Sequence, residues 1–168
     1  ARIVKQMFNL SRPYQGKICD FNAISVIRDV ITMIASEQCV FETINIDNDI
    51  AKVTMSEDHF RQVLYNIIKN GIEASPENSR IEIKAKINND RLSVIVSDLG
   101  EGMSDEVRQK IFDPFFTTKS KYSEGGLGLG LSTTKVIIES MGGSIDCVSE
   151  EGKGTTFTID LPINIVTQ

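Results

Sequence analysis

Residues 94–103 read Val-Ile-Val-Ser-Asp-Leu-Gly-Glu-Gly-Met, and the rest of the chain can be understood as a frame for this stretch. The run of β-branched residues predicts a buried strand that ends at Asp98. Gly100 and Gly102 allow the backbone to turn and to approach a ligand, because neither carries a Cβ. A carboxylate at a strand end can accept a hydrogen bond from an exocyclic amine, which selects adenine over guanine. By itself this pattern fits a nucleotide site and a plain turn equally well.

An aromatic motif and a long loop follow this strand. Residues 111–116 read Ile-Phe-Asp-Pro-Phe-Phe, and we expect the aromatic rings to be buried and to pin one end of an irregular loop over residues 113–127. A loop of this length in a compact domain is usually functional or mobile. The hydroxyl and ammonium groups of residues 117–121 can bind phosphate oxygens.

A glycine run closes this loop at the start of a helix expected over residues 128–141. Glycine and leucine alternate from residue 126 to residue 131. Bare backbone N–H groups at a helix start suit a polyphosphate. A flexible linker would lack the interleaved leucines. A Walker loop would need Gly-Lys-Ser/Thr after the glycines, and a Rossmann motif would follow directly from a strand.

Two asparagines lie on an earlier helix, which is expected over residues 57–74 with Ser56 as its N-cap. Apolar residues recur at helical spacing along one face of this helix. Asn66 and Asn70 are one turn apart on the flank of that face, where the core meets solvent. A carboxamide oxygen is a hard ligand that suits Mg²⁺. Two exposed asparagines on a solvated face would give the same pattern, so this helix alone leaves both explanations open.

The remaining pattern predicts an α/β (α+β) two-layer sandwich. Further helices are expected at residues 23–38 and 104–111. Strands are expected at residues 17–21, 41–47, 51–55, 80–87, 92–97, 144–149 and 155–161. Helices and mostly antiparallel strands in this order indicate one mixed sheet that is covered by helices on one face.

Composition limits the classes of function. The chain has 168 residues, enough for one domain, and a net charge of −5 without a basic block, so we expect no nucleic-acid partner. Three widely spaced cysteines, Cys19, Cys39 and Cys147, argue against a disulfide framework or a zinc site. No apolar run approaches the roughly 20 residues of a membrane span. The cysteines fit small buried side chains in a reducing, cytoplasmic location. Because Ala1 begins within a helical pattern, we expect a fragment whose parent protein is compatible with a membrane anchor.

Five motifs occur in a specific order: Asn-x-x-x-Asn, Asp-x-Gly-x-Gly, Phe-x-Pro-Phe-Phe, the glycine–leucine run, and Gly-Lys-Gly-Thr at residues 152–155. With these motifs the chain resembles the catalytic, ATP-binding domain of sensor histidine kinases, in the superfamily shared with gyrase, Hsp90 and MutL. The N, G1, F and G2 boxes of that family correspond to residues 64–74, 98–102, 111–116 and 126–131. The resemblance covers roughly residues 18–162, implies a Bergerat-type ATP-binding fold, and is similar in detail to the nitrogen-regulation and sporulation kinase branch.

The resemblance also implies roles for individual residues. Asn70 is expected to bind Mg²⁺ with Asn66 beside it, and Asp98 is expected to contact the adenine amine with Thr155 nearby. The residues implied to bind ATP are Asn66, Asn70, Asp98, Gly100, Gly102, Lys119, Gly126, Leu127, Gly128, Leu129, Gly130, Leu131 and Thr155. Two positions depart from the family pattern. Leu127 replaces a commoner Thr or Ser, which a backbone contact tolerates, and Glu73, where many relatives carry Lys, receives no phosphate role.

The single histidine, His59, begins the helix over residues 57–74 and lacks the sequence context of the family's phosphoacceptor. The resemblance therefore implies transfer from ATP to a histidine on a dimerisation domain outside this chain, with no catalytic side chain expected within it. Residues 1–14 would be a dimerisation-helix tail and linker, residues 15–163 the catalytic domain and residues 164–168 a tail. The implied partners are that dimerisation domain and a response regulator. The parent is expected to be a homodimer, and the fragment is compatible with a monomer.

Three alternatives remain open. A serine kinase of the anti-sigma type shares the nucleotide boxes and would phosphorylate a serine-bearing partner. An ATP-operated clamp such as gyrase or MutL usually carries Glu as a water activator where this chain has Asn66, which argues against efficient hydrolysis. A nucleotide-free docking module is disfavoured because no box is degenerate.

Overall fold

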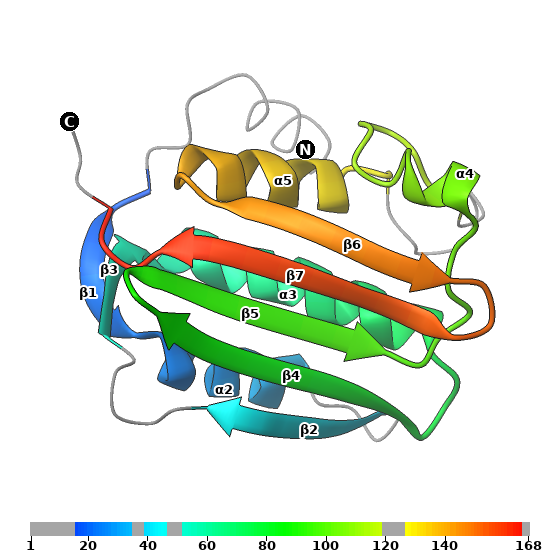
Figure 1. Ribbon diagram of the computed structural model, residues 1–168, viewed down its shortest axis with the longest axis horizontal. Coiled ribbons are helices and arrows are strands. Elements are labelled where there is room, and N and C mark those ends of the chain that lie inside the picture. Colours follow the sequence, from blue (N-terminus) through cyan, green and yellow to red (C-terminus); the bar gives the residue numbers. More distant parts are fainter. Residues whose placement is uncertain (1–15, 35–38, 47–51, 119–126, 166–168) are drawn as a thin grey trace.

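The computed structural model describes residues 16–34, 39–46, 52–118 and 127–165. Along the chain these residues form β1 (Ile18–Asn22), α2 (Ala23–Ile34), β2 (Cys39–Ile46), β3 (Lys52–Ser56), α3 (Glu57–Ala74), β4 (Ser79–Asn88), β5 (Arg91–Asp98), α4 (Asp105–Arg108), α5 (Gly130–Ser140), β6 (Ser144–Glu150) and β7 (Gly154–Pro162). In Figure 1 the strands β2, β4, β5, β7 and β6 form one layer, and α2, α3 and α5 cover one of its faces. The predicted two-layer sandwich is confirmed.

The main sheet is mixed and mostly antiparallel, as predicted. Its strand order within the described residues is β2-β4-β5-β7-β6, and only the β2–β4 pairing is parallel. The short strands β1 and β3 pair with each other in a separate two-stranded sheet, whereas the sequence favours a single sheet. Each of these strands runs directly into a covering helix, β1 into α2 and β3 into α3, and both strands contact α3.

The residues that follow β7 pair with β3. The Thr54 N–H donates to the Ile163 carbonyl oxygen at 2.7 Å, and the Ile165 N–H donates to the Thr54 carbonyl oxygen at 2.7 Å. A parallel bridge also joins Thr54 and Asn164. These bonds attach the last described residues to the small sheet.

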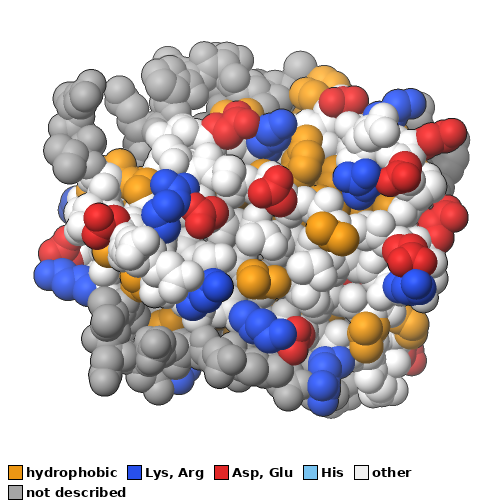
Figure 2. All heavy atoms as spheres, in the orientation of Figure 1, with side chains coloured by type: hydrophobic (Ala, Val, Ile, Leu, Met, Phe, Trp, Pro, Cys, Tyr) orange, Lys and Arg blue, Asp and Glu red, His pale blue; other side chains and the backbone are white. Residues whose placement is uncertain are grey.

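Alternation decides which face of each strand is buried. In β4, the side chains of Ile81, Ile83 and Ala85 are buried, whereas Lys84 forms an ion pair with Glu82 at 2.8 Å on the opposite face. The strands β5 and β7 follow the same alternation, so one face of the sheet is apolar. Figure 2 shows the other face, where basic and acidic side chains intermingle around scattered apolar ones.

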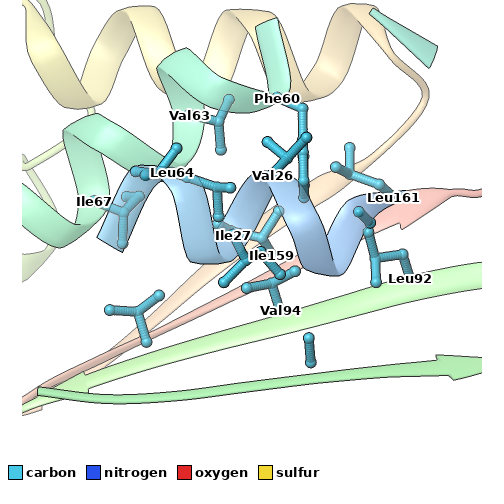
Figure 3. Packing of buried hydrophobic residues seen from close by; sticks show 14 of the residues in the cluster. Val26, Ile27, Phe60, Val63, Leu64, Ile67, Leu92, Val94, Ile159 and Leu161 are labelled. Carbon is cyan, nitrogen blue, oxygen red and sulfur yellow. The ribbon is translucent and has the colours of Figure 1, made fainter. Parts of the chain in front are cut away.

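The apolar face of the sheet and the covering helices share one core. Figure 3 shows α2 and α3 directing apolar side chains toward β5 and β7. The labelled residues are Val26 and Ile27 of α2, Phe60, Val63, Leu64 and Ile67 of α3, Leu92 and Val94 of β5, and Ile159 and Leu161 of β7. None of these side chains is more than 3% exposed. Burial of a side chain of this size contributes roughly 1.5–3 kcal/mol. This core fixes the orientation of α3, and with it the flank that carries the two asparagines.

Two helices differ in length from the prediction. The helix expected over residues 104–111 is shortened to α4, which Ser104 caps by accepting from the Val107 N–H at 3.3 Å. The helix α5 begins at Gly130 and not at residue 128, because Gly128 has a φ of +68° that a right-handed helix does not adopt. Residues 1–12, expected to be helical, lie outside the described residues. Within the described part of the chain, no helix combines the length and the apolar character that crossing a membrane requires.

Candidate nucleotide site

Asp98 is a buried carboxylate at the end of β5 with one oxygen already committed. Its Oδ1 accepts from the Gly100 N–H at 2.9 Å and from the Thr155 N–H at 3.1 Å, and the side chain is only 7% exposed. Burial raises the pKa of Asp98 above its ordinary value, and these two backbone hydrogen bonds oppose the rise. No described residue donates to Oδ2 of Asp98. The carboxylate is therefore positioned by the backbone and keeps one acceptor for a ligand.

Glycines allow the chain to approach Asp98 from three sides. A Cβ at Gly71 of α3 would lie 3.4 Å from the Asp98 Cβ and 3.6 Å from its Oδ2. A Cβ at Gly154, whose φ is +100°, would collide with the Asp98 carbonyl group, and one at Gly100 would collide with the Ala74 carbonyl group. Gly71 is a poor helix former in an otherwise strong helix. A Cβ there would make only ordinary van der Waals contact with Asp98, so the positions that require glycine are Gly100 and Gly154.

Thr155 lies beside Asp98 and its hydroxyl is fixed by a residue that the sequence did not reveal. The Ser149 hydroxyl donates to the Gly154 carbonyl oxygen at 3.0 Å, and its oxygen lies 2.9 Å from the Thr155 hydroxyl. Because Ser149 has a single hydroxyl hydrogen, the Thr155 hydroxyl must donate to Ser149. The lone pairs of the Thr155 oxygen then remain as acceptors. The hairpin of β6 and β7 places Ser149 opposite Thr155. The glycines at residues 152 and 154 predict this hairpin from the sequence, but the strand pattern does not mark Ser149 as part of the site.

The start of α5 differs from the starts of the other described helices. Asn22, Ser56 and Ser104 each accept a hydrogen bond from a backbone N–H in the first turn of α2, α3 and α4. The start of α5 follows Leu129 and has no side-chain cap. The unpaired N–H groups and the positive end of the helix dipole make such a start attractive to an anion.

The two predicted asparagines have different surroundings. The Nδ2 of Asn66 donates to the Thr134 Oγ1 at 3.1 Å and lies 3.4 Å from the Gly130 carbonyl oxygen, which joins α3 to the first turn of α5. Asn66 is therefore not a solvated surface residue. Asn70 is half-buried and forms no side-chain hydrogen bond with any described residue, so its carboxamide oxygen is available to a ligand.

The loop that precedes α5 is closed at its base, but not in the manner predicted. Ile111 is buried and Phe112 and Phe116 pack against the core, whereas the ring of Phe115 is 59% exposed. Burial of Phe115 was therefore a wrong expectation. Its φ of +66° turns the backbone so that its N–H donates to the Gly128 carbonyl oxygen at 2.9 Å, and the ring is left outside.

The remaining predicted site residues divide into two groups. Leu129 is buried, Leu131 packs against the core, and Leu127 is exposed at the start of the described segment. Lys119 and Gly126 lie outside the described residues, so their predicted phosphate contacts stay predictions.

Figure 1 shows the parts of the site at one end of the sandwich, on the right in that view: β5 and α3 end there and β7 and α5 begin there. The helix α3 touches both halves of the site, since Gly71 lies against Asp98 and Asn66 bonds to the start of α5. These two positions are separated by about 7.5 Å along the helix axis. Within the described residues no group of three or more His, Cys, Asp or Glu side chains could hold a metal ion. A metal here would need ligands from a bound phosphate as well as Asn70, which is the manner in which Mg²⁺ is usually held.

Fold and site together fit the class of nucleotide-binding domains built on a two-layer α/β sandwich. Residues 55–165 match the family described as histidine kinase-, DNA gyrase B-, and HSP90-like ATPases. The chain belongs to this family, which confirms the resemblance seen in the sequence.

Individual relatives narrow the comparison to sensor histidine kinases. The chain is 32% identical to sensor histidine kinase ZraS of Klebsiella oxytoca, over 97% of this chain and 35% of the relative. It is 33% identical to sporulation kinase D of Bacillus subtilis (strain 168), over 97% of this chain and 32% of the relative. The chain thus spans about a third of the length of these two relatives. The sporulation kinase agrees with the predicted branch.

Solved structures agree with this grouping. The nucleotide-free catalytic domain of histidine kinase ThkA is similar with a TM-score of 0.74 and 32% identity, over 88% of this chain and 97% of that chain. ThkA in complex with the response regulator protein TrrA is similar with a TM-score of 0.76 and 31% identity, over 96% of this chain and 46% of that chain. The chain is therefore similar to nearly the whole of a histidine kinase catalytic domain.

Proposed function

We propose that this chain is the catalytic domain of a two-component sensor histidine kinase, which presents the γ-phosphoryl group of ATP to a histidine on a dimerisation domain outside the chain. One observation carries the proposal. The helix α3 joins a buried acceptor, Asp98, to an uncapped helix start at Gly130, so that a single rigid element spans a base-binding end and a phosphate-binding end.

The base-binding end consists of Asp98 and Thr155. The Oδ2 of Asp98 would accept from the adenine amine, while Oδ1 stays bonded to two backbone N–H groups. The Thr155 oxygen offers a second acceptor beside it. Guanine presents a carbonyl oxygen where adenine presents the amine, so a carboxylate at this position rejects it.

The phosphate-binding end consists of the first turn of α5 and the flank of α3. The N–H groups that follow Leu129 would bind phosphate oxygens, with Lys119 and Gly126 as further proposed contacts. The carboxamides of Asn70 and Asn66 fit Mg²⁺, which prefers few protein ligands beside water and phosphate. When bound, the ion would neutralise charge on the phosphate oxygens.

The role of these residues is to position the nucleotide. The incoming imidazole nitrogen forms a bond to the γ-phosphorus while the bond to the leaving ADP oxygen breaks, and neither event requires a nucleophile from this chain. The chain holds the triphosphate, orients it and leaves the γ-phosphoryl accessible. We assign His59 no part, because it lies in the first turn of α3, at the opposite end of that helix from Asn70 and Gly71.

The partners and boundaries follow from the same proposal. The catalytic domain would comprise residues 15–163, preceded by a linker from the dimerisation helices. A response regulator would receive the phosphoryl group, and the occurrence of TrrA in a complex with ThkA supports such a partner. The parent would be a homodimer with this domain in the cytoplasm.

Nucleotide titration tests the proposal. We expect ATP to bind with Mg²⁺ and GTP to bind much more weakly, and failure to bind ATP would refute the function. Asn70→Ala is expected to abolish phosphoryl transfer to a separately supplied dimerisation domain. Unchanged transfer would exclude the metal role of Asn70 without affecting the adenine role of Asp98.

The clamp alternative has a specific observation against it. Such a clamp usually carries Glu as the water activator at this position, whereas Asn66 is a neutral carboxamide whose nitrogen donates to Thr134. It cannot remove a proton from water. A serine kinase would differ from the proposal in its acceptor alone, and an assay with histidine-bearing and serine-bearing acceptors separates the two.

A further inference from the structure

We propose that Thr134 is a positioning residue, whose buried hydroxyl sets which atom of the Asn66 carboxamide faces the phosphate-binding end. The inference rests on the proposed function and deepens it. Thr134 is fully buried, one turn into α5, and belongs to none of the motifs that identify the site.

The direction of the hydrogen bonds at Thr134 is fixed by its chemistry. The Thr134 hydroxyl donates its single hydrogen to the Gly130 carbonyl oxygen at 2.8 Å. It can therefore only accept from Asn66, whose side chain lies 3.1 Å away. The carboxamide must present Nδ2 to the hydroxyl, since its oxygen would find no hydrogen there.

The Gly130 carbonyl reinforces this orientation. It lies 3.4 Å from the Nδ2 of Asn66, and a flipped carboxamide would bring Oδ1 toward the same carbonyl oxygen. Two acceptors in contact repel each other, so the flipped carboxamide is disfavoured both at the Thr134 hydroxyl and at the Gly130 carbonyl. An asparagine without such partners has no fixed preference between its two orientations. Thr134 thus holds Oδ1 of Asn66 away from α5 and on the side available to a bound ion or its water.

The same contacts couple two elements of the site. Asn66 and Asn70 share one flank of α3, while Gly130 begins the helix whose uncapped start is the proposed phosphate-binding end. The bonds from Asn66 to Thr134 and Gly130 fix the distance between these elements. A threonine that only bonds back to the carbonyl four residues earlier would serve its own helix alone. Thr32 of α2 does this, donating to the Arg28 carbonyl oxygen at 2.8 Å, and it provides a matched control.

The test compares ATP affinity with excess Mg²⁺ and with EDTA in the wild type, Thr134→Val, Thr134→Ser and Thr32→Val. Valine keeps the shape and removes the hydroxyl. We expect Thr134→Val to weaken ATP binding about 10-fold with Mg²⁺, which corresponds to the loss of one well-formed hydrogen bond. In EDTA the same variant should weaken ATP binding less than about 2-fold. Thr134→Ser should restore most of the affinity, and Thr32→Val should match the wild type in both conditions.

A second measurement does not depend on any variant folding. In the nucleotide-free wild type, the side-chain amide protons of Asn66 should show slowed hydrogen exchange by NMR, because one of them bonds to a buried hydroxyl. Fast exchange of both protons would overturn the inference. So would a Thr134→Val variant that loses the same ATP affinity in Mg²⁺ and in EDTA, or that loses none in either condition. A wild type that fails to bind ATP would instead refute the proposed function, so the two failures are distinguishable.

Discussion

The two ends of the site are held by different kinds of bond. At the base-binding end, Asp98 is fixed by backbone N–H groups from its own turn and from β7, inside the hydrogen-bond ladder of the sheet. At the phosphate-binding end, the start of α5 is joined to α3 through the side chain of Asn66. Among the described residues, the base of the preceding loop is joined by the bond from the Phe115 N–H to the Gly128 carbonyl oxygen.

The difference predicts different behaviour. A backbone ladder loses nothing when a surface side chain changes, so the base-binding end is preformed and independent of Mg²⁺. A contact that depends on two side chains can be removed by substitution of either one, so the phosphate-binding end is the adjustable part of the site. Substitutions at the first end should change what binds, and substitutions at the second should change how metal and nucleotide cooperate.

The largest effect is expected for Asp98→Asn. The Oδ1 of asparagine can keep both backbone hydrogen bonds, while its Nδ2 would meet the adenine amine donor to donor. We expect ATP affinity to fall by about 100-fold or more, with the nucleotide-free domain still folded. Titration calorimetry with ATP and with inosine triphosphate measures this. Discrimination against inosine should relax, because its carbonyl oxygen can accept from Nδ2, and retained ATP affinity would show that Asp98 does not contact the base.

The next largest effects are expected when one glycine at each end of the site is replaced by alanine. Gly154→Ala requires a φ of +100° and forces a Cβ into the Asp98 backbone, so the free energy of unfolding should fall by about 2 kcal/mol or more. Gly128→Ala places a Cβ 2.6 Å from the Phe115 carbonyl carbon, at the base of a loop. We expect it to weaken ATP binding about 10-fold with a smaller loss of stability.

Urea unfolding and ATP titration of these two variants check the contrast. Gly152→Ala is a control, because its φ of +75° also lies in the left-handed region while a Cβ there meets nothing within 4 Å. If Gly128→Ala proves as destabilising as Gly154→Ala, the loop base belongs to the core of the fold and the distinction between the ends is lost.

The next effect is the pH dependence of stability that Asp98 causes at the base-binding end. Burial raises the pKa of Asp98 above its ordinary value of 3.8, so the folded state holds this proton more tightly than the unfolded chain does. The contribution of Asp98 to stability is then fully present below pH 3.8 and is lost as pH rises through the folded-state pKa. Asp98→Asn should therefore be at least as stable as the wild type near pH 7, and this advantage should vanish in acid.

The pH dependence of ATP affinity has the opposite direction to the pH dependence of stability. The adenine amine needs an ionised acceptor, so ATP affinity of the wild type should fall on acidification, beginning above pH 3.8. Affinity and thermal unfolding measured across the same pH series test both trends. A wild type that binds ATP equally well through the whole acid range would contradict the assigned contact.

Features set by near neighbours were predictable from the sequence. The alternation of β4, the caps at Ser56 and Ser104 and the carboxylate at the end of β5 each depend on residues a few positions apart. The contact of Asn66 with Thr134 joins residues 68 positions apart, and it exists only because α3 and α5 lie side by side. No periodicity encodes such a pair.

Two further differences between the prediction and the structure also arise from contacts between separate parts of the chain. The pairing of β1 with β3 depends on where α2 and α3 pack, which strand propensity does not contain. The exposure of Phe115 follows from its positive φ, and that conformation depends on the bond to Gly128 across the loop. The order of the five motifs still identified the family, because those motifs describe the ligand that the fold must hold and not the contacts that hold the fold together.

The smallest effect is expected for Ser149→Ala, and it tests the comparison most directly. Removal of the Ser149 hydroxyl frees the Thr155 hydroxyl to rotate, so its oxygen is no longer held as an acceptor. We expect ATP affinity to fall by only about 2- to 5-fold, because the carboxylate of Asp98 remains in place. Unlike the loss in Thr134→Val, this loss should be equal in Mg²⁺ and in EDTA. Ser140→Ala, which removes a hydroxyl bonded to the Ile137 carbonyl oxygen at the far end of α5, is the control for a lost serine. If the Ser149→Ala loss appears only with Mg²⁺, the base-binding and phosphate-binding ends are coupled, and the backbone ladder does not isolate one from the other.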